Sequence, residues 1–454
     1  MKPHNNKLAL ALFAAGMLFS GISAAQTVNL QQAVDMSLSA DPRIKEREAL
    51  VEAARGLLAE VKGNEGWRIS ANAFIGLTKQ VEGGFYQGGA YSGTTPRTDG
   101  DDWNGLSDWT HVELALIKPL YTFGKVDAYG EAAAGNIDIK RGDVRQSRAE
   151  TVFDTKRAYY GYLTARDTRL FLEDMQSRLE SSISRAQRAL KNETGEVTQA
   201  ELYSLQATRG LVGKYVHQAR AVEKISLDGL KVLTGVGLDA PLSVADERLE
   251  PAPFPAAALA DLQARALAER PEMQQLEAGL KAKRALVAAK KADLMPDIYA
   301  GVVGSYNYAS RREHLENPHL YDPFNGGGLT PVVGIRWEGA FDVGSARVTQ
   351  AQAELEALNQ KKQFALRGIP FEVGEAYANA KANFDAQKDL AEGAASARRW
   401  VIAAMADFSA GLEKGDRLAE AIKSYVLAQT EYLRTVNDYN VNVAQIDKLI
   451  GEQK

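Results

Sequence analysis

The C-terminal end of the chain repeats apolar residues at a helical period. Ten positions from Leu418 to Ile450 are separated alternately by four and three residues, and nine of them are apolar or aromatic: Leu418, Ile422, Tyr425, Gln429, Tyr432, Val436, Tyr439, Val443, Ile446 and Ile450. A near-strict 3.5-residue repeat predicts a helix that supercoils in a left-handed sense against partner helices. The stretch from Leu202 to Leu233 keeps the same spacing, with seven of its ten positions apolar.

These patterns predict two pairs of long helices, each joined by a glycine-marked turn. The pairs span residues 125–191 with 196–234, and 345–410 with 416–450. A helix of 67 residues is roughly 100 Å long at about 1.5 Å per residue. Such lengths favour a bundle, a rod or a tube over a compact globule.

Between the helices, four segments alternate apolar and polar residues as strands do: residues 67–80, 109–121, 297–309 and 330–342. Runs of this length suit tilted strands that cross a bilayer, with lipid on one side and a polar lumen on the other. We expect Val333, Ile335 and Trp337 to face lipid. We expect the lumen to be lined by Glu113, Arg336 and Glu338. A half-buried soluble sheet would show the same alternation.

The chain is internally duplicated. A shift of 229 residues aligns Leu30 with Leu259 and Pro42 with Pro271, and the shift falls to 216 where Gly195 aligns with Gly411. Each half contains a short helix, a second helix that begins at the proline, two strands and the long helix pair. The predicted organisation is a first repeat at 26–238, an extended proline-containing linker at 239–255 and a second repeat at 256–454.

The first 25 residues have the layout of a cleavable secretory signal. Lys2 and Lys7 precede an apolar run from Leu8 to Phe19, and Ser23-Ala24-Ala25 offers small residues for cleavage. Removal of this segment leaves 52 of the 54 basic residues against 58 acidic ones, a net charge of −6. This charge argues against a nucleic-acid partner. The chain has no cysteine, so it has no disulfide, thiolate metal site or N-terminal lipidation site.

Beyond the signal, no apolar stretch approaches the roughly 20 residues of a transmembrane helix. If the exported chain enters a membrane, it must therefore do so with strands. Four strands cannot close a membrane barrel, and an open edge cannot face lipid because its backbone groups would lack partners. The sequence thus predicts that two or three copies assemble.

Several short motifs follow one another in order along the chain, among them Ala40-Asp41-Pro42, the strand-to-helix junction Pro119-Leu120-Tyr121-Thr122-Phe123-Gly124-Lys125, the inter-helix segment from Phe408 to Leu418, and Asp438-Tyr439-Asn440-Val441. Together these motifs resemble those of TolC-like outer-membrane factors over almost the whole mature chain. The resemblance implies a mainly α-helical chain whose long helices form a periplasmic α-barrel. Its four strands would join a shared twelve-stranded barrel of a homotrimer in the outer membrane.

The resemblance also implies a function in export. The channel would serve a tripartite efflux or type I secretion system and would contact a periplasmic adaptor, an inner-membrane pump and outer-membrane lipid. No catalysis and no cofactor or metal site is expected in this chain. The turns between the long helices would form the periplasmic gate and the adaptor contact, and the predicted residues are Gly195, Glu196, Gly411, Gly415, Asp416, Arg417 and Glu420. An ordinary solvated helix turn explains the charged members of this set equally well.

The alternative is a periplasmic coiled-coil scaffold or adaptor without a pore. An enzyme finds little support, because the sequence lacks an HExxH pair, a Gly-x-Ser-x-Gly elbow and a phosphate loop. The histidines are scattered, and His314 and His319 fall in a predicted loop, where solvation is the simpler interpretation.

Overall fold

The computed structural model describes residues 26–80, 86–87, 90–91, 105–193, 197–312, 322–338 and 341–452. The predicted signal segment and the two loop histidines lie outside these residues. The chain divides into two compact units. One comprises residues 1–46, 145–270 and 366–454, and the other comprises residues 47–144 and 271–365.

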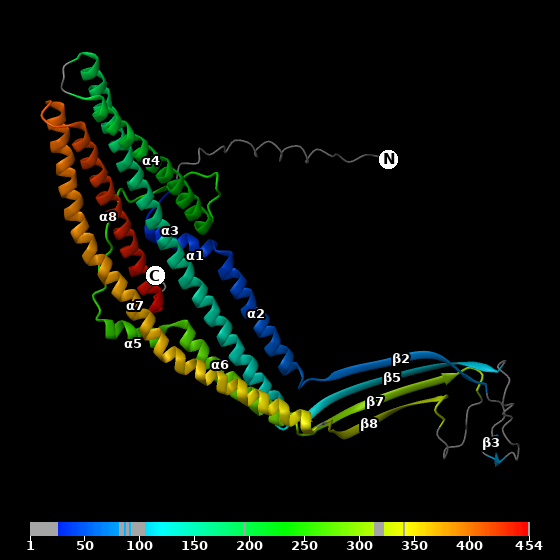
Figure 1. The fold of residues 1–454 in the computed structure, drawn as a ribbon. Helices are drawn as coiled ribbons and strands as arrows, with labels where there is room; N and C mark the ends of the chain where they lie inside the picture. Colours follow the sequence, from blue (N-terminus) through cyan, green and yellow to red (C-terminus); the bar gives the residue numbers. More distant parts are fainter. Residues whose placement is uncertain are drawn as a thin grey trace, which may run out of the picture. The chain divides into compact units, whose positions relative to one another are not determined.

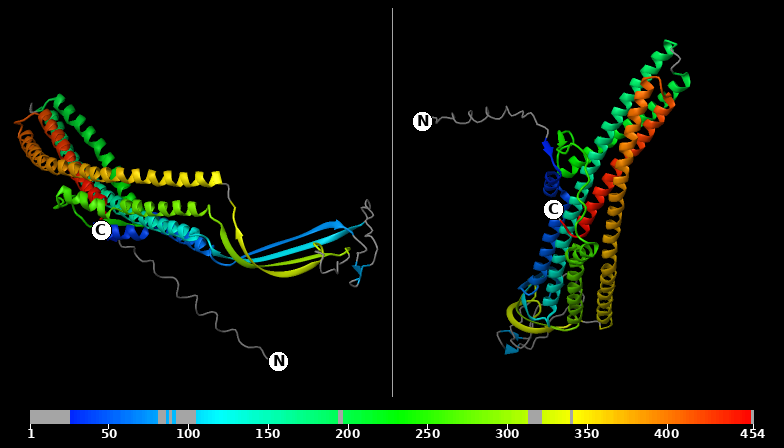
Figure 2. Two further views of the ribbon diagram at one scale, coloured as in Figure 1. Left: turned by 90° about the horizontal axis from the view of Figure 1, so that it is seen from below. Right: turned by 90° about the vertical axis from the view of Figure 1, so that its left-hand side faces the viewer.

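The second unit contains a four-stranded antiparallel sheet built from the described residues (Figure 1). Its strands are β2 (Arg68–Lys79), β5 (Leu106–Tyr121), β7 (Asp297–Ala309) and β8 (Gly326–Arg336), in the order β2-β5-β7-β8. The same strands lie side by side in the left-hand view of Figure 2. Two very short strands, β3 (Tyr86–Gln87) and β4 (Ala90–Tyr91), form a separate pair.

Two short helices in each half meet at a proline, as the sequence predicts. Helix α1 (Leu30–Ala40) is followed by α2 (Pro42–Gly63), and α5 (Leu259–Glu269) by α6 (Pro271–Ala292). Proline suits the first helical position because its missing N–H would have had no partner within the helix. The segment predicted as an extended linker contributes β6 (Leu242–Val244), which pairs in parallel with β1 (Gln26–Val28).

The long helices are α3 (Lys125–Lys191), α4 (Gln199–Thr234), α7 (Phe341–Ser409) and α8 (Gly415–Leu449). Helix α3 has the predicted bounds. Helix α4 begins three residues later than predicted, and α7 begins four residues earlier. None of the helices in the described part of the chain has an apolar stretch of the length and hydropathy that a membrane span requires.

The 3.5-residue repeat of α8 forms one side of the core in the first unit. Seven of its ten predicted positions are buried, among them Leu418, Ile422 and Val436, which are fully inaccessible. Leu418, Ile422 and Tyr425 pack with side chains of α3 and α4 in one hydrophobic cluster, and Val436 packs with side chains of the same two helices in a second cluster. The supercoiling period therefore identifies the buried face of these helices.

Candidate functional site

The register of the sheet separates its residues into two faces. Val333 lies opposite Ala300, and Leu116 lies opposite both Val302 and Ile69. Directly paired residues share a face of a sheet, and side chains alternate along each strand. One face is therefore largely apolar and includes Ile69, Ala71, Ala73, Ile75, Leu77, Val112, Leu114, Leu116, Ile298, Ala300, Val302, Leu329, Pro331, Val333 and Ile335. Three polar residues of β5 share this face: Asp108 opposite Leu77, Thr110 opposite Ile75, and Lys118 opposite Ala300.

This apolar face is open in the single chain. Ile69, Ile75, Leu329 and Val333 each expose more than three quarters of their accessible surface. Soluble monomers rarely leave an apolar patch of this extent uncovered. The face thus requires an apolar environment that the chain itself does not supply.

The opposite face carries most of the polar residues, together with small residues and several apolar or aromatic ones such as Ile117 and Trp109. Asn72, Glu113 and Ser305 are paired across β2, β5 and β7. At the helix-side end, Arg336 lies opposite Asp297, and its guanidinium is 3.5 Å from the carboxylate. The same carboxylate accepts a hydrogen bond of 2.9 Å from the Lys125 ammonium at the start of α3. Two predicted lumen residues, Glu113 and Arg336, therefore share the face opposite Val333 and Ile335.

The end of the last strand corrects the prediction. Strand β8 ends at Arg336, so Trp337 and Glu338 lie beyond it and α7 begins at Phe341. The cause is the partner strand: β7 begins at Asp297, directly opposite Arg336, and no residue of β7 remains to pair with Trp337. The Trp337 indole N–H instead donates to the carbonyl oxygen of Leu294, 3.2 Å away.

The turn between α7 and α8 is shaped by two glycines. Gly411 has a φ of +72°, and the neighbouring Leu412 N–H donates to the Asp407 carbonyl across the helix end. This left-handed position favours glycine. Gly415 is buried, and a Cβ there would lie 3.0 Å from the Glu201 Cβ and 3.4 Å from the Phe408 ring. The turn therefore approaches α4 too closely for a larger side chain.

The charged residues of this turn remain in solvent. Asp416, Arg417 and Glu420 are all exposed. The Arg417 backbone N–H donates to the Asp416 carboxylate at 3.0 Å, and its guanidinium is 3.9 Å from Glu413. Within the described residues, no ion pair joins Arg417 to Glu420. Their partners in the other predicted turn, Gly195 and Glu196, lie outside the described residues.

A capping box at the start of α4 was missed in the sequence. The Glu201 N–H donates to the Thr198 hydroxyl, and the Glu201 carboxylate accepts from the Thr198 N–H at 2.9 Å. The Thr-x-x-Glu spacing is a known signature of a helix start and could have placed it. Glu201 is also the residue that Gly415 approaches. The capping box therefore holds the first turn of α4 at the point where it contacts the turn between α7 and α8.

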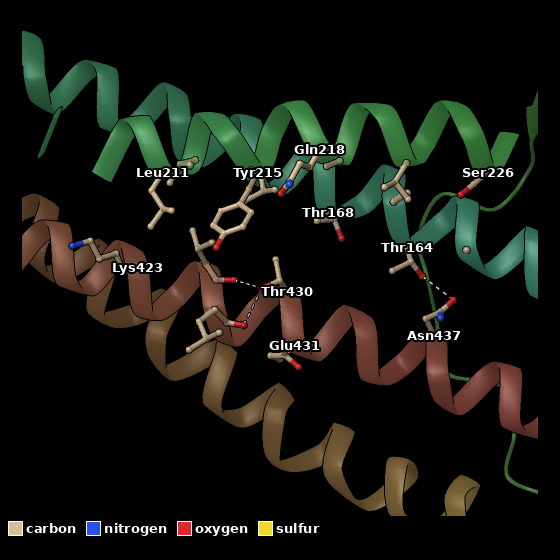
Figure 3. Close-up of a pocket in the computed structure, with 18 residues that line it drawn as sticks. Thr164, Thr168, Leu211, Tyr215, Gln218, Ser226, Lys423, Thr430, Glu431 and Asn437 are labelled. Atoms are coloured by element: carbon tan, nitrogen blue, oxygen red, sulfur yellow. Dashed lines mark hydrogen bonds between the residues drawn. The ribbon is translucent and has the colours of Figure 1, made fainter. Parts of the chain in front are cut away.

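An open groove of about 680 Å³ lies between α3, α4 and α8 in the first unit (Figure 3). Its floor is made of small residues of α3, such as Gly161 and Thr164, and its walls carry apolar side chains such as Leu211 and Leu427. Leu427 exposes 64% of its surface. Among the described residues, no group of His, Cys, Asp and Glu side chains could hold a metal ion.

The comparisons with known proteins agree with this geometry. Residues 262–452 match the outer membrane efflux protein family. No curated protein matches the chain. The solved outer-membrane channel OprN superposes with a TM-score of 0.72 at 18% identity, covering 94% of this chain and 91% of OprN.

Two further solved structures give similar scores. The CmeC outer membrane channel of Campylobacter jejuni gives a TM-score of 0.74 at 15% identity, covering 94% of this chain and 86% of CmeC. The outer membrane protein VceC of Vibrio cholerae gives 0.70 at 16% identity, covering 94% and 97%. The family match confirms the resemblance for residues 262–452, and the solved structures share the fold over 94% of the chain.

Proposed function

We propose that this chain, whose residues 262–452 belong to the outer membrane efflux protein family, is one subunit of an outer-membrane export channel. The observation that carries the proposal is the sheet, which has one largely apolar face and one more polar face. A transmembrane barrel needs this division, with lipid outside and water inside. Each of the four strands is joined at one of its ends to a helix. These helices would extend the channel into the periplasm. The matched family consists of efflux proteins rather than enzymes.

The channel is proposed to be a homotrimer. Strands β2 and β8 are the two edges of the sheet, and their free backbone groups would be unsatisfied in lipid. Three copies would give twelve strands, and two copies would give eight. The helices also expose large apolar side chains, with Phe364 at 77% and Ile225 at 69%, which further copies of the chain would cover.

The helical turns are proposed as the periplasmic gate and the contact with an adaptor of a tripartite efflux or type I secretion system, with an inner-membrane pump beyond. The turn at Gly411–Glu420 supports this proposal because its glycines and its charged residues differ in how tightly the structure constrains them. Its glycines are fixed by geometry, whereas Asp416, Arg417 and Glu420 are exposed and make only weak local contacts. Exposed pairs contribute about 0–1 kcal/mol each, so contacts made here can break without unfolding the helices.

Two measurements test the channel. Cross-linking and native mass spectrometry in detergent should give three copies, and the purified protein should conduct ions across a planar bilayer. A stable monomer that remains in the periplasmic fraction and conducts nothing would refute the channel and favour the pore-free scaffold. A dimer that conducts would refute only the trimer.

A further inference from the structure

The polar face of the sheet is covered at the end that lies away from the helices. Ser107, Asn307 and Ala309 belong to this face, yet their exposed fractions are 0%, 7% and 2%. Asn72, on the same face and nearer the helices, is exposed. Since a sheet face that lines a lumen should be open along its length, something of the chain's own covers its outer end.

The cover consists of two short arms, Ser310–Arg312 after β7 and Asp322–Asn325 before β8. The second arm is held by Asp322, whose carboxylate accepts the N–H groups of Phe324 and Asn325 at 2.9 and 3.2 Å. The Asn325 side chain then joins the arms, because its oxygen accepts from the Ala309 N–H at 2.8 Å and its amide donates to the Arg312 carbonyl at 3.2 Å. Asn325 itself is 9% exposed.

The first arm is attached to β5. The Arg311 N–H donates to the Ser107 hydroxyl at 2.8 Å, and the Ser310 hydroxyl donates to the Asp108 carboxylate. The Arg312 guanidinium donates to the Lys79 carbonyl at 3.0 Å at the end of β2. Asp108 lies opposite Leu77 on the apolar face, so the bonds that place the arms across the polar face are those to Ser107 and the Lys79 carbonyl, together with the bonds of Asn325.

Aromatic rings fill the space between the arms and the strands. The Arg312 guanidinium lies 3.8 Å above the Phe324 ring, and Phe324 contacts Trp109 edge-on at 5.2 Å between ring centroids. Trp109 in turn contacts Phe74 at 4.8 Å. The register puts Phe74 and Trp109 on the same face as Glu113. The cluster formed by Arg312, Phe324, Trp109 and Phe74 therefore projects from the polar face.

We propose that this cluster forms a constriction with a ring of arginine charges at the outer mouth of the channel, which limits conductance and sets ion selectivity there. The inference rests on the proposed channel, since the polar face must enclose the lumen. Twelve strands spaced about 4.8 Å apart and tilted by about 40° enclose a barrel roughly 24 Å across between backbones. Each of the three copies would contribute one stack of Arg312 on Phe324 that points into the barrel. Together the three stacks would occupy a large part of that width. Three guanidinium groups there attract anions and repel cations.

Single-channel recording in planar bilayers tests the constriction with three variants of the full chain. Phe324→Ala removes the ring that holds Arg312 over the sheet and should raise conductance above that of the wild type. Arg312→Glu reverses three charges at the mouth and should shift the reversal potential in a salt gradient toward cation selectivity. Tyr308→Ala is the matched control, because Tyr308 lies at the same height on the apolar face, opposite Thr110. It should change neither quantity.

The outcomes separate the constriction from the channel itself. Trimer yield on mild detergent gels shows whether each variant assembles. If assembled Phe324→Ala and Arg312→Glu channels both conduct and select as the wild type does, the constriction is refuted while the channel stands. If Tyr308→Ala changes conductance as much as Phe324→Ala, the effect does not depend on the face, and the constriction is again refuted. If the wild type does not conduct, the proposed channel fails, and this inference fails with it.

Discussion

An arginine introduced at Val333 should destabilise the assembled channel strongly, whereas one at the adjacent Val332 should not. Val333 lies on the apolar face opposite Ala300, and Val332 lies on the polar face opposite Gly301. The two positions are adjacent in the strand. They therefore lie on opposite faces of the sheet but at almost the same depth in the membrane. A one-residue error in register would exchange the two results.

The magnitude follows from the position of Val333 along β8. Each residue of a strand tilted by about 40° advances roughly 2.5 Å along the membrane normal. The exposed side chains of Trp67 and Trp337 flank the helix-side ends of β2 and β8, as interfacial tryptophans do. Val333 is three residues from the end of β8, about 8 Å inside the apolar band, whose midplane is at roughly 12 Å.

Arginine costs about 2–4 kcal/mol at the midplane of a membrane barrel and about 0–1 kcal/mol near its edge. We therefore expect Val333→Arg to lower the stability of the assembled channel by roughly 2–3 kcal/mol. Ile335→Arg, one residue from the end of the strand, should lower it by about 0–1 kcal/mol. The assay is the fraction of detergent-resistant oligomer as denaturant is raised, with conductance measured on what assembles. Val332→Arg should assemble normally and alter conductance. Equal losses for Val333→Arg and Val332→Arg would refute the division of the sheet into lipid and lumen faces.

Three further predictions concern the first unit. Replacing Arg417 and Glu420 together by alanine should leave the yield of oligomer unchanged. It should increase the leakage of normally excluded antibiotics through the channel or weaken cross-linking to the adaptor. If leakage and cross-linking are both unchanged, the two charges belong to an ordinary solvated turn. Gly415→Val should lower the free energy of unfolding by about 1–3 kcal/mol, because the larger side chain would be overpacked against Glu201 and Phe408. Thermal unfolding measures this loss. Gly393→Val is the control for helix propensity, because a Cβ at Gly393 meets nothing within 4 Å. Burial raises the pKa of the Asp41 carboxyl, but hydrogen bonds from Arg43 and Thr151 more than offset it and the pKa lies below its ordinary value of 3.8. Asp41→Asn should therefore lower the free energy of unfolding by about 1–3 kcal/mol at neutral pH. The difference from the wild type should shrink as the pH falls below 3.8, where the carboxyl of the unfolded wild type protonates, and should vanish below the lowered pKa of the folded protein. A difference independent of pH would contradict this.

The helices were predictable because their determinants are local. The bounds of α3 and the buried stripe of α8 follow from a period that the packing of long helices imposes on the sequence. The starts of α2 and α6 follow from a proline at the first helical position. The sharing of faces in the sheet was likewise predictable, because alternation is a property of each strand alone.

The features that could not be predicted depend on contacts between distant residues. Strand β8 ends at Arg336 because Asp297, 39 positions earlier, begins its partner strand. Nothing in the alternation of residues 330–342 encodes that limit. The need for glycine at position 415 arises from Glu201 on another helix, and the cover at the outer mouth from arms that fold back over β5. The capping box of Thr198 and Glu201, by contrast, had a local signature that could have been used.

The directions of the edge strands explain how copies of this sheet could close into a barrel. Strand β2 runs away from its adjoining helix and β8 runs toward the next one, because four antiparallel strands reverse direction three times. Placing β8 of one copy beside β2 of the next therefore continues the antiparallel order without a break. The two edges also match in length, with 12 residues in β2 and 11 in β8, so few backbone groups would remain unpaired at each seam. An odd number of strands per chain would force a parallel pair at each such seam, so the even number from two duplicated hairpins is what allows repeated copies to form a uniform antiparallel barrel.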